Sequence, residues 1–197
     1  MNRERFEKQL SFILEADKEK NILRQTHLTG YSRRENDAEH AWHMAMMIYL
    51  LREYSNEEID AAKAMMMALI HDVVEIDAGD TYAYDTEGLQ TQKEREQRAA
   101  ERIFGMLPED QHYELLSLFE EFEAGESAEA RFAKAMDNFQ PLLLNHTNGG
   151  MDWLVHKVTK TKVVGRQKTT ALGSEEIWKY TEEIINENID KGNIRNE

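Results

Sequence analysis

The chain has no cysteine among its 197 residues, which excludes disulfide bonds and metal sites built on thiolates. Proline and glycine are scarce, with 2 and 10 residues, and this scarcity favours long helices joined by few turns. Basic residues are in deficit, because 24 Lys and Arg face 38 Asp and Glu, for a net charge of −14. Since nucleic-acid backbones are polyanions, this charge argues against a general nucleic-acid-binding protein.

Long apolar segments are also missing. The N-terminal residues 1–12 contain no apolar run of the kind found in a secretory signal. No stretch elsewhere approaches the roughly 20 apolar residues that a membrane-spanning helix needs. The length suits one domain with a substantial core. We therefore expect a soluble, cytoplasmic protein with a single domain over residues 1–197 and no membrane partner.

Apolar residues recur at helical spacing along nearly the whole chain, and the sequence predicts an all-α fold. Asn36 and Glu39 have the pattern of a capping box at the start of a helix that runs to about Tyr54. In that helix, Trp42, Met46 and Tyr49 share one stripe. The other helices are predicted near Phe6, after Ser55, over residues 87–106, after Pro108, after Ser127 and over residues 175–190.

The most informative local feature is the pair His71–Asp72, which lies near the end of an apolar run over residues 64–76. A carboxylate in an apolar setting has to be paired, hydrogen-bonded or bound to a metal, because desolvating it alone is costly. A divalent cation would satisfy the imidazole and the carboxylate together. A buried ion pair between the two residues is the alternative interpretation.

Further candidate ligands lie on two other predicted helices. His40 is near the start of one, in RRENDAEHAWH, and Asp137 is inside another, in AKAMDNFQPLLLN. Together with His71 and Asp72 they would form a site with nitrogen and oxygen ligands only, which suits one divalent ion of Mn, Co, Fe, Mg, Ni or Zn. Such an ion can acidify a bound water into a nucleophile. The set of four residues favours a catalytic metal site over a buried ion pair.

These motifs resemble the HD-domain phosphohydrolases, and within them the YfbR-like 5′-deoxynucleotidase group. The resemblance rests on ENDAEH, ALIHDVVEIDAGD and AMDNFQPLLLN, and its core spans residues 23–145. It implies a helical bundle of the HD-domain type, one bound divalent ion and a small-molecule nucleotide substrate. The implied reaction removes the 5′-phosphate from a (deoxy)nucleoside monophosphate by attack of a metal-activated water. It also implies a homodimer.

The resemblance assigns roles to residues around the ligands. Glu75, one turn after His71, would orient the attacking water or act as general acid or base. Asp80 would lie near the scissile phosphate and donate a proton to the departing oxygen. Arg24 matches an arginine that faces the substrate in this group, but Gln25 replaces the tryptophan that follows it there. The choice between deoxyribose and ribose is therefore open.

Other basic residues also deserve consideration as phosphate ligands. Arg33 and Arg34 precede the helix that carries His40, so we expect them near the substrate. Residues 155–170 contain five Lys or Arg and no acid, and a surface helix is the favoured interpretation of this stretch. His43 follows His40 by three residues, and a packing or supporting role suits it better than ligation.

Two other functions are compatible with the same residues. The first is a different HD-type reaction, either hydrolysis of a nucleoside triphosphate or another phosphoester, or oxygenation at two metals. The second is a non-catalytic interaction module that the metal stabilises. Metal stoichiometry and the effect of replacing Glu75 would distinguish them.

Overall fold

A computed structural model describes residues 1–81 and 88–197 of the chain. The elements begin with the helix α1 (Arg3–Ala16), the 3-10 turn η1 (Asp17–Asn21), the strands β1 (Leu23–His27) and β2 (Arg34–Asn36), and the helix α2 (Asp37–Leu51). After the 3-10 turn η2 (Arg52–Tyr54) come α3 (Ala61–Ile70), α4 (Glu75–Ala78), α5 (Gly88–Phe104), α6 (Glu109–Ala124) and α7 (Ala128–Thr147). The chain ends with α8 (Met151–Val155), α9 (Lys160–Gln167), α10 (Thr170–Gly173) and α11 (Glu175–Asp190). The all-α expectation is confirmed, apart from the small antiparallel pair β1–β2.

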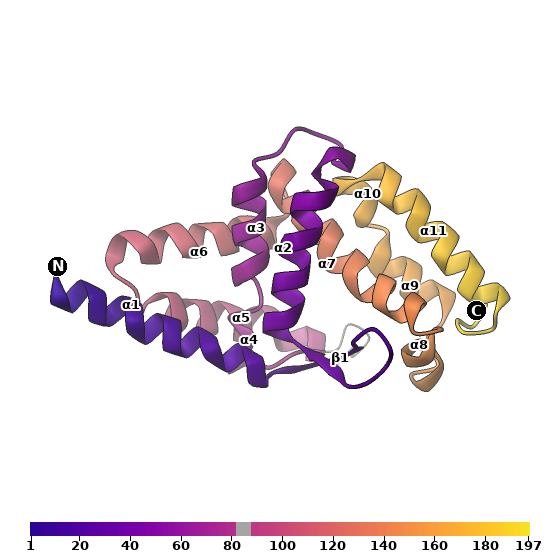
Figure 1. Cartoon of the computed structure of the whole chain (residues 1–197), viewed down its shortest axis with the longest axis horizontal. Coiled ribbons are helices and arrows are strands. Elements are labelled where there is room, and N and C mark those ends of the chain that lie inside the picture. Colours follow the sequence, from indigo (N-terminus) through magenta and orange to yellow (C-terminus); the bar gives the residue numbers. More distant parts are fainter. Residues whose placement is uncertain (82–87) are drawn as a thin grey trace.

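The longest of the described helices, α7, lies at the centre of the fold. It contacts α2, α3, α6, α8, α9, α10, α11 and β1. Figure 1 shows α1, α5 and α6 towards one end of the molecule and α8 to α11 towards the other, with α2 and α3 crossing between them. A side chain on α7 can therefore meet residues from distant parts of the sequence.

Two groups of buried apolar side chains fill the interior. The larger group joins α2, α3, α7 and α11, and it includes Met44, Met67, Met136 and Ile184. The smaller group joins the end of α3 to α5 and α6, and Ile70, Val73 and Phe104 belong to it. His71 and Asp72 follow Ile70 directly, so the polar pair enters the interior at the edge of the smaller group.

Several helix ends follow from the predicted caps. The Asn36 side chain accepts from the Glu39 backbone, and the Glu39 side chain accepts from the Asn36 backbone, which confirms the capping box of α2. Ser127 caps α7 and Gly125 ends α6 with a φ of 63°. The helix start predicted directly after Ser55 is wrong, because α3 begins at Ala61 and its cap is Asp60. The predicted start at Glu87 lies outside the described residues.

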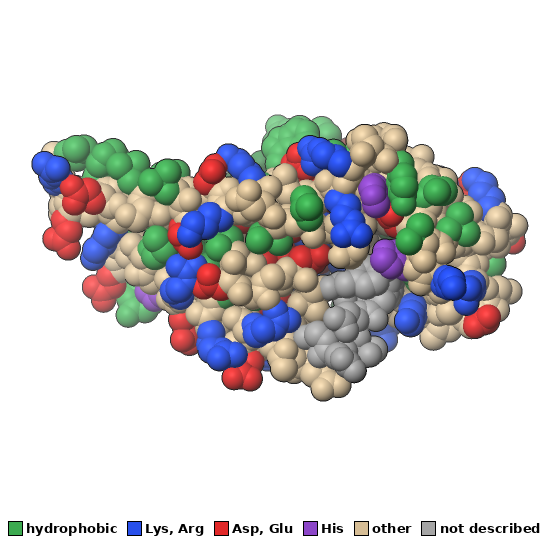
Figure 2. Space-filling model, turned by 90° about the horizontal axis from the view of Figure 1, so that it is seen from below, with side chains coloured by type: hydrophobic (Ala, Val, Ile, Leu, Met, Phe, Trp, Pro, Cys, Tyr) green, Lys and Arg blue, Asp and Glu red, His purple; other side chains and the backbone are tan. Residues whose placement is uncertain are grey.

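Not every apolar stripe is buried. Phe6, Leu10, Ile13 and Leu14 form one face of α1 and remain 40 to 70% exposed. Figure 2 shows this stripe as a green row on the arm at its left. Trp42, Met46 and Tyr49 are likewise exposed on α2. None of the described helices is both long and apolar enough to cross a lipid bilayer.

Candidate metal centre

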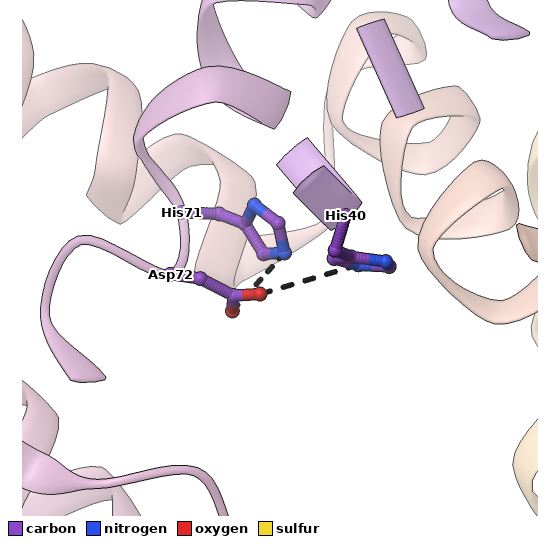
Figure 3. Close-up of side chains that lie close together, drawn as sticks. All are labelled: His40, His71 and Asp72. Atoms are coloured by element: carbon purple, nitrogen blue, oxygen red, sulfur yellow. Dashed lines mark ion pairs between the residues drawn. The ribbon is translucent and has the colours of Figure 1, made fainter. Parts of the chain in front are cut away.

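Three elements bring the candidate ligands together. His40 lies in the first turns of α2, which the capping box holds in place. His71 caps the C-terminus of α3, and Asp72 lies in the turn before α4. One ligand atom from each of these three residues lies within 4.8 Å of the other two, and Figure 3 shows the side chains pointing towards one another. All three residues are buried.

Asp137, from the middle of α7, adds a fourth donor. Its Oδ1 lies 3.1 Å from Nε2 of His40 and 4.0 Å from Nε2 of His71. Asp72 approaches the same two nitrogens, at 4.0 Å from His40 and 3.1 Å from His71. The structure thus gathers two imidazoles and two carboxylates, all of which the sequence predicts as ligands.

The donor set fits a divalent cation. Nε2 of His71 is buried and makes no hydrogen bond within the described part of the chain, although Asp72 is close to it. Its other ring nitrogen, Nδ1, lies 2.8 Å from the carbonyl of Ala68, which places the lone pair on Nε2 when the ring is neutral. A nitrogen oriented in this way beside two carboxylates has the arrangement of a ligand.

The buried acidic residues of the site also favour the binding of a cation. Burial raises the pKa of Glu75 to about 11, with the nearby carboxylates of Asp72 and Asp37 adding to it. Burial likewise raises the pKa of Glu35 and of Asp37 to about 7. Burial disfavours the charged form of Asp72 too, but His71 and Arg24 hold its pKa below the usual range. So many buried carboxylates are costly without additional positive charge.

The two histidines differ in their protonation. Burial, together with Arg24, lowers the pKa of His40 to about 4, so this ring is neutral at physiological pH. Burial opposes the charge of His71 as well, but Asp72 and Asp137 outweigh it and raise the pKa to about 9. A cation that binds here would replace that proton.

A cavity of about 270 Å³ opens onto the ligands. His71, Asp72 and Asp137 line it, while His40 lies behind them, fully buried. Glu75 and Asp80, the predicted catalytic residues, also line the cavity. Burial raises the pKa of Asp80, whereas Arg24, Arg166 and Arg34 act in the opposite direction. The predicted acid–base groups thus share one pocket with the ligands.

The predicted substrate arginines separate into two groups. Arg24, on β1, lines the cavity and lies 2.6 Å from Oδ2 of Asp72 and 3.4 Å from Oδ1 of Asp37. Arg33 is exposed and pairs with Glu39. Neither Arg33 nor the exposed Arg34 is among the described residues that line the cavity. The structure therefore brings Arg24 to the site and leaves the other two outside its walls.

Two residues at the site were not predicted from the sequence. Gln140 lies three residues after Asp137 on α7, and its Oε1 is 3.0 Å from Nδ1 of His40. Helical spacing from Asp137 would have indicated it. Arg166, on α9, lines the cavity with its Nη2 at 3.7 Å from Oδ2 of Asp137. Arg166 belongs to the basic stretch 155–170, for which the sequence favoured a surface helix. No local sequence pattern distinguishes Arg166 from the other basic residues of that stretch.

The fold and this cluster together define the class of the protein. A family model described as an HD domain matches residues 16–178, and the chain belongs to that family.

Among proteins of known sequence, the chain is similar to the human 5′-deoxynucleotidase HDDC2, with 32% identity over 111 residues, 56% of this chain and 53% of the human protein. The Dictyostelium discoideum protein of the same name is 32% identical over 114 residues, 55% of this chain and 60% of that protein. The chain spans about half the length of the curated relatives it matches.

Two solved structures share the fold. A predicted metal-dependent phosphohydrolase from Magnetospirillum magnetotacticum superposes with a TM-score of 0.92 and 47% identity, covering 96% of this chain and 95% of that one. A conserved hypothetical protein from Pyrococcus furiosus has a TM-score of 0.60 and 27% identity, covering 90% of this chain and 97% of its own.

Proposed function

We propose that this chain is a metal-dependent phosphohydrolase that removes the 5′-phosphate from (deoxy)nucleoside monophosphates. The observation that carries the proposal is the cluster of His40, His71, Asp72 and Asp137 beside a cavity lined by arginines. The names of the relatives, which are 5′-deoxynucleotidases and a metal-dependent phosphohydrolase, support it.

The four ligands would hold one divalent ion. When bound, such an ion lowers the pKa of a coordinated water and neutralises charge on the phosphate. Among the residues of the chain, Arg24 and Arg166 border the ligands on two sides and would bind the phosphate oxygens. Their positive charge would be most effective as negative charge grows on the phosphate in the transition state.

The acid–base groups would complete the reaction. Beside a bound cation the pKa of Glu75 would fall from the high value that it has without metal. As a carboxylate, Glu75 would then accept a hydrogen bond from the attacking water and orient it towards the phosphorus. Asp80 lines the same cavity, and burial favours its protonated form. In that form it would donate a proton to the departing 5′-oxygen.

A phosphate-release screen tests the proposal. The protein would be loaded separately with Mn²⁺, Co²⁺, Mg²⁺, Fe²⁺, Ni²⁺ or Zn²⁺ and offered deoxy- and ribonucleoside monophosphates with each base, with triphosphates in parallel. We expect release from monophosphates that a chelator abolishes. Release from triphosphates alone would instead support the other HD-type hydrolase. No release from any nucleotide with any metal would contradict the proposal.

We also propose that the protein works as a homodimer. Trp42, Met46 and Tyr49 on α2 and Met66 and Leu69 on α3 are all at least 40% exposed, and α2 packs against α3. Exposed apolar side chains on two helices that pack against each other favour a protein interface. Light scattering should give twice the chain mass, and Trp42→Glu should give the monomer. A monomeric wild-type protein would contradict this.

The cytoplasmic location stays a prediction.

A further inference from the structure

The cavity extends along α7, away from the ligand cluster. Asp137, Pro141 and Asn145 all line it, and they are spaced by four residues on an unbroken helix. Because each residue advances an α-helix by about 1.5 Å, Asn145 lies about 12 Å beyond Asp137. The part of the pocket beside Asn145 is therefore about two helical turns away from the part beside Asp137, where the phosphate is proposed to bind.

The amide of Asn145 has a defined orientation there. Its Nδ2 donates to the carbonyl oxygen of Pro141 at 3.0 Å. Since a carbonyl oxygen can only accept, the amide nitrogen has to face Pro141, and Oδ1 has to face the other way. The residue is only 7% exposed, and Oδ1 has no hydrogen-bond partner within the described ranges. A buried acceptor without a partner is rare in folded proteins, and this one belongs to a residue of the cavity wall, where a bound ligand could donate to it.

The walls around this acceptor suit a flat ring. Trp153 on α8 and Leu142 on α7 line the cavity, and both are buried. Asp152, beside Trp153, accepts from the backbone of His27, and its Oδ1 lies 2.7 Å from Nδ1 of that histidine, which ties α8 to β1. An aromatic and an aliphatic side chain in a wall that also carries an oriented polar group suit a small aromatic ligand.

We propose that this end of the cavity binds the nucleobase, and that Oδ1 of Asn145 accepts a hydrogen bond from an N–H on the far edge of the base. The inference rests on the proposed nucleotidase function. A sugar hydroxyl lies too close to the 5′-phosphate to span two helical turns, whereas the edge of the base extends well beyond the sugar. One N–H of Nδ2 is taken by Pro141, and Oδ1 is the atom of the amide that has no partner among the described residues.

This arrangement predicts recognition of a base without selection of one base. Adenine and cytosine carry an exocyclic amino group on that edge, guanine and thymine carry a ring N–H, and each can donate to one acceptor. A ligand that lacks such a donor would leave Oδ1 buried and unpaired. Its binding is therefore weakened.

The test changes the ligand and the protein in turn. Wild-type protein would be assayed with dAMP, with the purine deoxyriboside monophosphate that has hydrogen in place of the amino group, and with deoxyribose 5-phosphate, which has no base. We expect kcat/KM for dAMP to exceed that for the analogue about tenfold, as expected for one buried hydrogen bond. Asn145→Ala should reduce this ratio to about one, and it should also reduce the preference for dAMP over deoxyribose 5-phosphate.

Asn138 supplies a matched control, because it lies on α7, is 8% exposed and does not line the cavity. Asn138→Ala should change kcat/KM for all three substrates by the same factor, so the ratios between them should stay as in the wild type. Equal rates for dAMP and the analogue with wild-type protein would overturn the proposal, as would unchanged ratios in Asn145→Ala. If Asn145→Ala does not fold, the comparison of ligands on wild-type protein decides alone.

A binding measurement separates this inference from the proposed hydrolysis. Calorimetry with deoxyadenosine, which has no phosphate, reports the base subsite whether or not the protein releases phosphate. Binding that is weaker for the analogue without the amino group supports the subsite. Equal binding of the two nucleosides, or none, overturns it. Absence of phosphate release with intact, amino-dependent nucleoside binding would contradict the nucleotidase function only.

Discussion

The side chain of Gln140 holds His40 in one orientation. Its Nε2 donates to the carboxylate of Glu35 at 2.7 Å, so its Oε1 faces Nδ1 of His40 at 3.0 Å. Nδ1 therefore carries the proton, and the lone pair on Nε2 points towards Asp137. Three residues apart on α7, Asp137 and Gln140 thus contact the two nitrogens of the same ring.

This contact predicts that Gln140→Leu weakens metal binding. Without the acceptor, the His40 ring is free to rotate and to change its tautomer, so affinity should fall about 10- to 100-fold. Titration with Co²⁺, followed by absorption, measures it. His43 contacts the amide of Gln140, and within the described part of the chain no hydrogen bond joins it to the four ligands. His43→Leu therefore serves as the control and should keep affinity within a few-fold. Equal losses in both variants would contradict the role of Gln140.

A second prediction concerns Glu75. Glu75→Gln keeps the size of the side chain but removes its ability to exchange a proton, so kcat should fall about 10²- to 10⁴-fold. Metal content, measured by atomic emission, should stay at the wild-type level. Asp77 is the control, because it lies on the same short helix and is exposed beside Arg102. If Glu75→Gln loses metal in proportion to activity, Glu75 is a ligand and not an acid–base group.

A third prediction concerns which arginines contact the phosphate of the substrate. Arg166→Gln removes a positive charge that lines the cavity, and KM for nucleoside monophosphates should rise about tenfold. Lys168, exposed two residues later, is the control, and Lys168→Gln should leave KM unchanged. The same assay on Arg33→Gln and Arg34→Gln tests the substrate role predicted from the sequence. An unchanged KM in Arg166→Gln would exclude its contact with the phosphate.

The fourth prediction concerns pH and stability. Burial raises the pKa of Glu19 from 4.5 to about 8, with the charge of Asp72 adding to it, and Oε1 has no hydrogen-bond partner among the described residues. The folded chain binds this proton more tightly than the unfolded chain does. The resulting stabilisation is therefore complete below about pH 4.5 and is lost as the pH rises through about 8.

Glu19→Gln removes this titration, so its melting temperature relative to wild type should increase between about pH 4.5 and about pH 8. Thermal unfolding at several pH values measures the difference. Glu53→Gln, at an exposed position, should show no such trend. A constant difference between Glu19→Gln and wild type across this range would show that Glu19 is ionised in the folded protein.

Local signals explain which parts of the fold could be predicted. The capping box at Asn36 and the left-handed Gly125 act within one turn of chain, so the ends of α2 and α6 follow from sequence. The pair β1–β2 depends on contacts between residues 23–27 and 34–36, which no periodicity reveals. The exposure of Trp42 likewise depends on which face of α2 meets α7, and hydropathy alone does not decide this.

The same distinction applies to the candidate site. His40, His71, Asp72 and Asp137 could be proposed because each is an unusual polar residue within an apolar helical pattern, and the family motifs gave their grouping. Arg166 could not, because its approach to Asp137 depends on how α9 packs against α7. Asn145 could not either, since its significance lies in an unpaired oxygen that only the cavity reveals.

Titration of the metal-free protein with Mn²⁺ or Co²⁺, with phosphate release from dAMP as the readout, tests the central claim most directly. Activity should be absent at the start, rise in proportion to added metal and reach its plateau at about one ion per chain, as expected for one site with four protein ligands. Asp72→Ala should stay inactive throughout. Full activity without metal, or a plateau at about two ions per chain, would contradict the account.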